Sequence, residues 1–146
     1  MARIKIKTAG NFSFETTVDI QIGDINYGGH LANDAVLRIA HEARIRFLAR
    51  YGYTEKSIEG ESIIMTDAAV IYRSEAHHGD KLLIKTAIEE ITSAGFDMIY
   101  VITNTASGRE VAVVKTGLAF FNYSAGRITR TPEKFKSLME GKNEVV

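Results

Sequence analysis

The sequence predicts an α+β fold in which one long helix packs against an antiparallel sheet of five or six strands. A strand-like stretch comes first, a single long helical stretch follows, and four strand-like stretches joined by short turns come next. The helical stretch carries one apolar stripe, so we expect the sheet to curl around it. No linker or repeat divides the 146 residues, so we expect a single domain over residues 1–146.

The first strand is predicted from a strict alternation between Phe12 and Ile22. Every second side chain in this stretch is Phe, Thr, Val or Ile, and the side chains between them are polar. A period of two is typical of a strand with one buried face.

The long helix is predicted from a change of period after residue 32. Asn33 or Asp34 is expected to cap its N-terminus, and Gly52 is well placed to end it. Charged residues 38, 42 and 46 fall on the exposed face. The buried face is formed by apolar residues at helical spacing: Val36, Ile39, Ala40, Ala43 and Phe47.

The remaining strands are predicted to be joined by hairpins, because glycine-containing turns separate residues 62–73, 81–91, 96–105 and 110–123. A short helix is expected from Thr131, as the cap, and Pro132, at the first position. Both faces of 110–123 are apolar. One helix cannot cover both, so we expect a second subunit on the other face and at least a homodimer.

Composition excludes several classes of function. Eighteen basic and eighteen acidic residues give a net charge of zero, so we expect no nucleic-acid partner. The chain has no cysteine, its histidines lack convincing ligand spacing, and we predict no metal. No apolar run approaches the length of a membrane span, and MARIKIKTAGN at the start has no apolar core of a signal peptide. We therefore expect a cytoplasmic protein without a membrane partner.

The most informative stretch is GDINYGGHLAND, residues 23–34, between the first strand and the long helix. Gly28 and Gly29 permit positive φ and close approach of a ligand. The helix that follows directs free N–H groups and a partial positive charge at this corner, which suits an oxyanion. His30, Asn26 and Asp24 are the polar candidates around it. A tight glycine turn with a capped helix explains the same residues without any function.

This stretch resembles the hot-dog fold thioesterases, in the branch of the 4-hydroxybenzoyl-CoA and acyl-ACP thioesterases. Their pattern D-x-D-x-x-G-H-V-N-N is matched at Asp24, Gly29, His30 and Asn33, and the following HEAR resembles their E-A-R segment. The segments IYRSEA, HHGDKL and RTPEKF extend the resemblance over almost the whole chain. It implies a central helix wrapped by an antiparallel sheet, and a dimer or dimer of dimers with active sites between subunits. It also implies hydrolysis of an acyl-CoA or acyl-ACP thioester, with coenzyme A only as part of the substrate.

The sequence departs from the family pattern at Asn26, where the branch has its catalytic carboxylate. An amide cannot accept a proton at neutral pH, although it can orient water or bind the thioester oxygen. The base is then sought among His30, Asp67 and Asp24. Glu42 is kept as a further candidate, because a carboxylate on the central helix is the base in some related thioesterases, although Arg38 and Arg46 one turn away explain it as part of an exposed, salt-bridged face. Asp67 is included because a carboxylate in a mid-strand position beside Met65 and Ala69 is costly unless it is paired or functional. Substrate contacts are expected from Tyr27, Gly28, Gly29 and Asn33.

Three functions remain open at this point. The leading one is an acyl-thioester hydrolase in which water attacks the thioester carbonyl. The second is an (R)-specific enoyl-CoA hydratase, because G-D-x-N-P-x-H of those hot-dog enzymes is similar to GDINYGGH, although one extra residue precedes His30. The third is a non-catalytic acyl-CoA binding module, which Asn26 favours.

Overall fold

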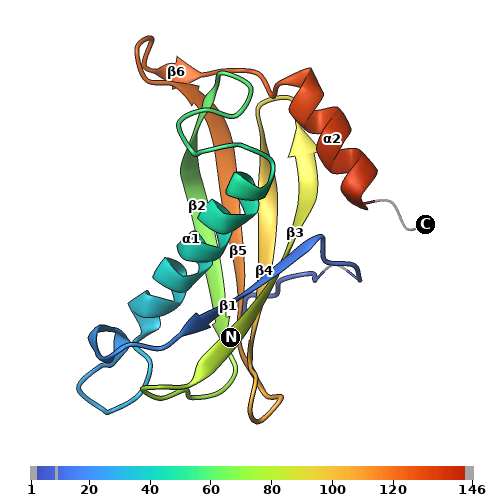
Figure 1. The fold of residues 1–146 in the computed structure, drawn as a ribbon. Coiled ribbons are helices and arrows are strands. Elements are labelled where there is room, and N and C mark those ends of the chain that lie inside the picture. The colour runs from blue at the N-terminus through green and yellow to red at the C-terminus, as the bar shows by residue number, and fades with distance from the viewer. Residues whose placement is uncertain (1–2, 9, 144–146) are drawn as a thin grey trace.

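The computed structural model describes residues 3–8 and 10–143, and it has the predicted order of elements (Figure 1). Over this part of the chain, no helix is long and apolar enough to cross a membrane. A 3₁₀ turn, Ile22–Asp24, separates the first strand from the first helix. The helices and strands are β1 (Phe14–Asp19), α1 (Asn33–Arg50), β2 (Ser62–Tyr72), β3 (Lys81–Thr92), β4 (Gly95–Asn104), β5 (Glu110–Asn122), β6 (Arg127–Ile128) and α2 (Glu133–Asn143).

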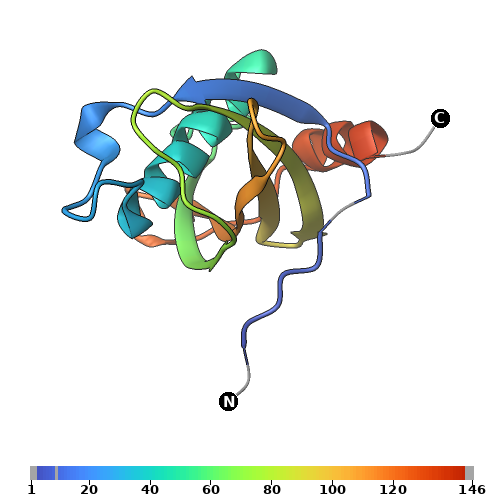
Figure 2. The same ribbon diagram turned by 90° about the horizontal axis from the view of Figure 1, so that it is seen from below.

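The strands form one antiparallel sheet in the order β1-β3-β4-β5-β2, with β6 paired to the end of β5. The sheet curves around α1, which lies on its concave face (Figure 2). This confirms the predicted α+β architecture of one long helix wrapped by a sheet. The physical cause is the single apolar stripe of α1, which the strands can cover only by curling.

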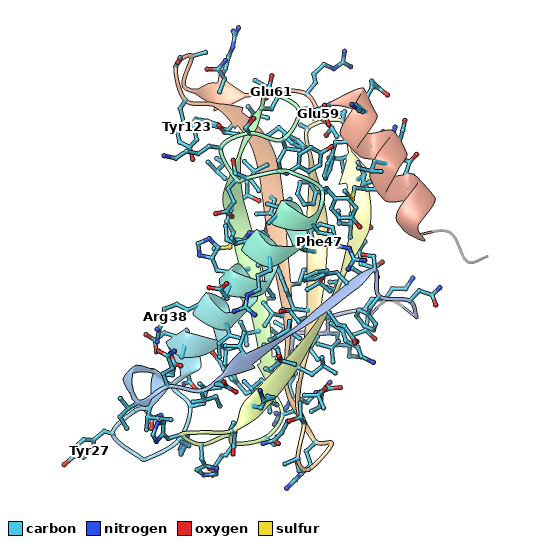
Figure 3. All side chains as sticks on the ribbon, in the orientation of Figure 1. Tyr27, Arg38, Phe47, Glu59, Glu61 and Tyr123 are labelled. Atoms are coloured by element: carbon cyan, nitrogen blue, oxygen red, sulfur yellow. The ribbon has the colours of Figure 1, made fainter. Side chains whose placement is uncertain are left out.

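The core lies between α1 and the concave face of the sheet. The predicted stripe is buried, and Phe47 at its centre is completely inaccessible (Figure 3). At one end of the sheet Phe135 of α2 packs against Phe96 and Phe120, with ring centroids 5.0 and 5.5 Å apart. The short C-terminal helix therefore closes the end of the core that α1 leaves open.

The ends of the elements differ from the sequence prediction in several places. Ile22 is exposed because the chain leaves β1 after Asp19 and enters the 3₁₀ turn. The N-cap of α1 is Ala32 and no side chain caps this helix, so the predicted cap at Asn33 or Asp34 is wrong. Gly52, with φ of 77°, does follow the end of α1 as predicted.

The C-terminal helix also begins later than expected. It starts at Glu133, and the backbone N–H of Lys136 donates to the carbonyl of Pro132 at 3.0 Å. The Thr131 hydroxyl donates to the carbonyl of Thr92 at 2.7 Å. Thr131 therefore ties the start of α2 to the hairpin between β3 and β4.

The second face of β5 is covered by the chain itself. Val113 and the neighbouring Ile99 of β4 lie on the convex face, away from α1, and both are buried. Lys5 and Ile6 line a cavity together with Ile99, because the N-terminal segment lies against this face (Figure 2). The N-terminal segment thus covers part of this face, so the two apolar faces of β5 do not by themselves require a second subunit.

Strand β2 ends the sheet and contains a bulge. Met65 pairs with Leu118, but Asp67, two residues later, pairs with Gly117, so Thr66 is an extra residue. The bulge turns Asp67 to the convex face, whereas Met65 lies on the α1 side with Leu118. Asp67 and Met65 therefore do not share a face as the simple alternation predicted.

Candidate functional site

The corner between β1 and α1, residues 20–34, is built mainly by backbone hydrogen bonds. The N–H of Leu31 donates to the carbonyl of Ala76 at 2.8 Å, and the N–H of Ala32 donates to the carbonyl of Asp24 at 2.9 Å. Inside the loop, the N–H of Asn26 donates to the carbonyl of His30 at 2.9 Å. These bonds fix the loop against the start of α1, so its side chains have defined positions.

Asn26 uses one end of its amide to hold the loop. Its Oδ1 accepts the N–H of Gly28 at 3.0 Å and that of His30 at 3.4 Å. Two backbone donors at the oxygen leave the NH₂ group as the free end, and no described residue accepts a hydrogen bond from it. Asn26 therefore presents a hydrogen-bond donor to the corner.

Asp24 is occupied by structural contacts. Its Oδ2 accepts the N–H of Gln21 at 2.9 Å, and its Oδ1 lies 3.2 Å from Nη1 of Arg38 on α1. The side chain is only 15% exposed. Because both oxygens are engaged, Asp24 ties the 3₁₀ turn to α1 and is not a free base. Arg38 consequently pairs with Asp24, while Glu42 pairs with Arg46 at 2.8 Å.

The glycines and Tyr27 form the tip of the loop. Gly29 has φ of +88°, a conformation that side chains rarely adopt, whereas Gly28 does not. Positive φ is therefore needed at one of the two glycines only. A side chain at Gly28 would lie 3.4 Å from both Asn26 Oδ1 and His30 Nε2. Tyr27 is fully exposed and projects away from the body of the protein (Figure 3).

His30 is a second polar side chain of the loop that contains Asn26. Its Nε2 is 3.9 Å from Oε1 of Glu75, which follows β2, and the imidazole is about one-third exposed. The ring lies beside Gly28, as does the Asn26 amide. The structure thus brings His30 and Asn26 to one place, as the sequence predicted.

The N-terminus of α1 completes the corner. Because Ala32 offers no capping side chain, the N–H groups of Asn33 and Asp34 have no acceptor among the described residues. Such N–H groups, at the positive end of an 18-residue helix, are hydrogen-bond donors for an oxyanion. Tyr72 of β2 donates its hydroxyl to the carbonyl of Asn33 at 2.9 Å, which fixes this end of the helix against the sheet.

Asp67 is not part of this corner. Its Oδ1 accepts the hydroxyl of Thr66 at 2.9 Å, on the convex face of the sheet. No hydrogen bond or ion pair between described residues joins it to the corner. Within one chain, Asp67 therefore does not replace the carboxylate that Asn26 lacks.

A second polar cluster, which the sequence reasoning did not find, lies halfway along α1. The guanidinium of Arg44 is only 7% exposed, and it donates to Glu55 Oε2 at 2.8 Å and to the Tyr100 hydroxyl at 3.0 Å. The Tyr100 hydroxyl also lies 2.8 Å from Oγ1 of Thr116. One feature of the sequence indicates this cluster. Arg44 lies four residues after Ala40, which places a charged side chain on the buried stripe of α1.

The charges of this cluster stabilise each other. Burial by itself raises the pKa of the Glu55 carboxyl, but hydrogen bonds from Arg44 and His41 outweigh it and hold that pKa below its ordinary value. Burial by itself lowers the pKa of Arg44, and the interactions with Tyr100 and Glu55 reverse this and raise it. The ion pair is therefore fully charged at neutral pH.

Comparisons with known proteins agree with this geometry. The family model of the thioesterase-like superfamily matches residues 20–138, which include the corner, α1 and all of the strands after it. No curated protein sequence matches the chain. Among the described residues, no group of three His, Cys, Asp or Glu side chains is placed to hold a metal ion.

Solved structures with the same fold include several thioesterases. A 1,4-dihydroxy-2-naphthoyl-CoA thioesterase from Synechocystis is 18% identical, with a TM-score of 0.81 over 90% of this chain and 98% of its own. A thioesterase from Thermus thermophilus, complexed with coenzyme A and Zn, is 21% identical, with a TM-score of 0.79 over 92% and 98%. A thioesterase superfamily protein from Jannaschia sp. CCS1 is 15% identical, with a TM-score of 0.82 over 94% and 87%. The family match covers most of the chain, and the chain therefore belongs to the thioesterase-like superfamily of thioester hydrolases with the hot-dog fold.

Proposed function

We propose that this thioesterase hydrolyses acyl-CoA thioesters at the corner between β1 and α1. The observation that carries the proposal is the uncapped N-terminus of α1, with two unpaired N–H groups, directly after the loop that holds the free NH₂ of Asn26 and the imidazole of His30. A thioester carbonyl bound there is polarised, and the tetrahedral oxyanion formed by water attack is stabilised more than the carbonyl.

In this mechanism the N–H groups of Asn33 and Asp34, with Asn26, hold the carbonyl oxygen. Water attacks the carbonyl carbon, and the C–S bond breaks when the oxyanion collapses. His30 protonates the departing sulfur, because its ring lies beside the amide that holds the carbonyl. Gly28 and Gly29 leave space for the thioester, and Tyr27 at the loop tip is available to the pantetheine arm.

Coenzyme A is preferred over acyl carrier protein as the carrier in this proposal. Two of the proteins with the same fold support it by name, one as a naphthoyl-CoA thioesterase and one by its complex with coenzyme A. The proposal leaves the nature of the acyl group open.

We also propose a homodimer, through β2 and not through the face of β5. Strand β2 is a terminal strand of the sheet, and no strand of the described residues pairs with its outer edge. It is 11 residues long and exposes the apolar side chains of Met65 and Tyr72. An edge of this length is a template for pairing with a second copy, and such dimers can associate further in pairs.

The enoyl-CoA hydratase alternative is less well supported. It needs the carboxylate of Asp24 and the imidazole of His30 as a dyad, but Asp24 is occupied by Gln21 and Arg38. A non-catalytic binding module would keep the carbonyl site and lack turnover.

The test is release of free thiol from a panel of aliphatic and aromatic acyl-CoA and acyl-ACP substrates, with crotonyl-CoA hydration measured in parallel. We expect thiol release with CoA substrates. Hydration of crotonyl-CoA without thiol release would favour the hydratase. Tight binding of acyl-CoA with no turnover of any substrate would favour the binding module and would contradict the proposal.

A further inference from the structure

We propose that a basic cavity between the N-terminal segment and the end of β2 binds the phosphates of the coenzyme A carrier. This inference rests on the proposed hydrolysis of acyl-CoA, because it names where the protein holds the nucleotide end of that substrate. The side chains that hold the phosphates are Arg3, Lys5 and Arg73. All of them belong to one chain, so residues of a single copy are enough to line the cavity.

The cavity lies between residues 3–6 and the last residues of β2. Its volume is about 950 Å³, and ligand pockets have volumes of roughly 300–1,000 Å³. Besides its basic side chains, the cavity has apolar surface from Ile4, Ile6, Val70 and Ile71. A nucleotide combines the same two properties, because its base is flat and largely apolar on its faces and its phosphates are charged.

The charge of this cavity differs from that of other cavities in the molecule. No acidic residue lines it, whereas three others each include at least one glutamate, such as Glu59, Glu55 and Glu89. The chain as a whole has equal numbers of basic and acidic residues. Three cations without a carboxylate in the lining are therefore a local concentration of positive charge, which attracts anions.

The cations are available to a ligand. Over residues 3–8 and 10–143, no ion pair involves Arg3 or Lys5. Arg73 has one ion pair, in which its Nε lies 3.4 Å from Oε1 of Glu110, and its two Nη groups donate to no described residue. Free ammonium and guanidinium groups bind phosphate, and a guanidinium can donate two parallel hydrogen bonds to it.

The N-terminal segment is positioned by its contact with the convex face of the sheet (Figure 2). Ile6 is half-buried, and it lines both the basic cavity and the cavity that contains Ile99 of β4. Ile99 is itself buried. This contact places Arg3 and Lys5 beside the end of β2, so that they share a cavity with Arg73, which is distant in the sequence.

Tyr72 connects the basic cavity to the corner. It lines the cavity, and its hydroxyl donates to the carbonyl of Asn33 at 2.9 Å. Asn33 is also the residue whose N–H group holds the thioester carbonyl in the proposed function. The end of β2 and the loop before α1 lie at the same end of the molecule (Figure 1). The pantetheine arm of a substrate bound at the corner can therefore pass the end of β2 and reach the cavity.

The cavity fits coenzyme A better than acyl carrier protein. Coenzyme A carries a pyrophosphate and a 3′-phosphate on a free nucleotide, whereas the carrier protein joins a single phosphate to its own folded surface. Three cations grouped around a space of this volume match the denser charge of the nucleotide.

The first measurement compares one acyl group on coenzyme A, on 3′-dephospho-CoA and on pantetheine. For the full-length variant Arg3→Ala/Lys5→Ala, we expect KM for acyl-CoA to rise about tenfold with little change in kcat, because hydrogen bonds to charged groups are lost. The rise should be smaller for the dephospho carrier and absent for acyl-pantetheine. Arg73→Gln should show the same pattern, and it tests the cavity without any change to the N-terminal segment.

The matched control is Lys7→Ala. It removes the same charge from the same segment, but Lys7 lines the cavity that contains Glu89 and Glu90 and not the basic cavity. All three KM values should stay at those of the wild type.

The second measurement does not depend on hydrolysis. Isothermal titration calorimetry compares adenosine 3′,5′-bisphosphate with adenosine and with inorganic phosphate. We expect the wild type to bind the bisphosphate about tenfold or more tightly than either comparator, and the binding to weaken with added salt. Arg3→Ala/Lys5→Ala and Arg73→Gln should each lose most of this affinity, and Lys7→Ala should keep it.

The outcomes separate the two proposals. No thiol release by the wild type, together with bisphosphate binding that depends on Arg3, Lys5 and Arg73, overturns the hydrolysis and supports the cavity as a nucleotide site. Thiol release with the same KM for acyl-CoA in the wild type and the variants overturns the cavity and leaves the hydrolysis intact. An equal rise of KM for acyl-pantetheine, or a loss confined to acyl-ACP, also overturns the assignment to the nucleotide.

Discussion

At the scale of single residues, Asn26 gives this corner a different chemistry from that of a site with a carboxylate at the same position. Its oxygen holds the loop and its NH₂ group is free. We predict that Asn26→Asp, which restores the acidic residue of the family pattern, lowers kcat/KM by about 100-fold, because it removes a donor and adds a negative charge where the oxyanion forms. Thiol-release kinetics measure this. Unchanged or higher activity would show that the position acts as a base.

Arg44 is the residue with the largest expected effect on stability. Its guanidinium is buried between Glu55 and Tyr100, and its removal leaves a carboxylate and a hydroxyl without their partner. We predict that Arg44→Met lowers the free energy of unfolding by about 3 kcal/mol, measured by urea denaturation. Arg46→Met, on the exposed face of the same helix, should cost about 1 kcal/mol or less. Equal losses in the two variants would contradict a special role for the buried cluster.

Tyr53 provides a prediction at alkaline pH. Burial, followed by the hydrogen bond to Glu59, raises the pKa of Tyr53 to about 12. A raised pKa in the folded state means that the stabilisation is complete below about pH 10, the ordinary tyrosine value, and is lost as the pH rises through about 12. Stability should therefore fall between these pH values in the wild type, and less steeply in Tyr53→Phe. Denaturant unfolding at each pH measures the difference.

At the scale of elements, the start of α1 does not follow the capping preferences of its sequence. Asn33 and Asp34 have the side chains of good caps, yet the helix begins at Asn33 and Ala32 precedes it. The position of the cap is decided by the loop, which the backbone bonds from Leu31 to Ala76 and from Ala32 to Asp24 hold in place. The free N–H groups follow from this tertiary constraint.

The bulge in β2 is the element that decides the position of Asp67. A side chain at Gly117 would collide with the Asp67 carboxylate. The bulge, which places Asp67 opposite this position, therefore requires a glycine there. We predict that Gly117→Ala costs about 2 kcal/mol, and that the cost falls in the background of Asp67→Ala. Gly95→Ala is the control, because its side chain would meet the backbone of Leu118 instead. Its cost should be the same in both backgrounds, and a double-mutant cycle from denaturation curves compares them.

At the scale of the whole molecule, the free edge of β2 determines the proposed assembly. Asp67 is the central residue of this strand and its carboxylate lies on the convex face. A Glu at the adjacent Ala68, on the α1 face, would add a second pair of like charges across the two-fold axis, on the other side of the sheet. We predict that Ala68→Glu shifts the protein from dimer to monomer and lowers activity with it. Thr17→Glu, on β1 at the other edge of the sheet, should leave the dimer intact. Sedimentation equilibrium measures both, and a monomeric wild type would contradict the dimer.

The sequence by itself determined the order of elements, the buried stripe of α1, the hairpins and the place of the corner. These features depend on periods of side chains and on turn residues that are neighbours in the chain. Asn26 and His30 could be selected in the same way, because both lie in one short loop.

Only the tertiary structure decided which residues the charged side chains pair with, which segment lies on the convex face of β5, and on which face of the sheet Asp67 lies. Arg44 meets Glu55 and Tyr100, and the N-terminal segment reaches the convex face, through contacts between residues far apart in the chain. One extra residue in β2 reverses every later side chain. Periodicity cannot reveal such contacts, because it records which face a residue occupies and not what lies opposite that face.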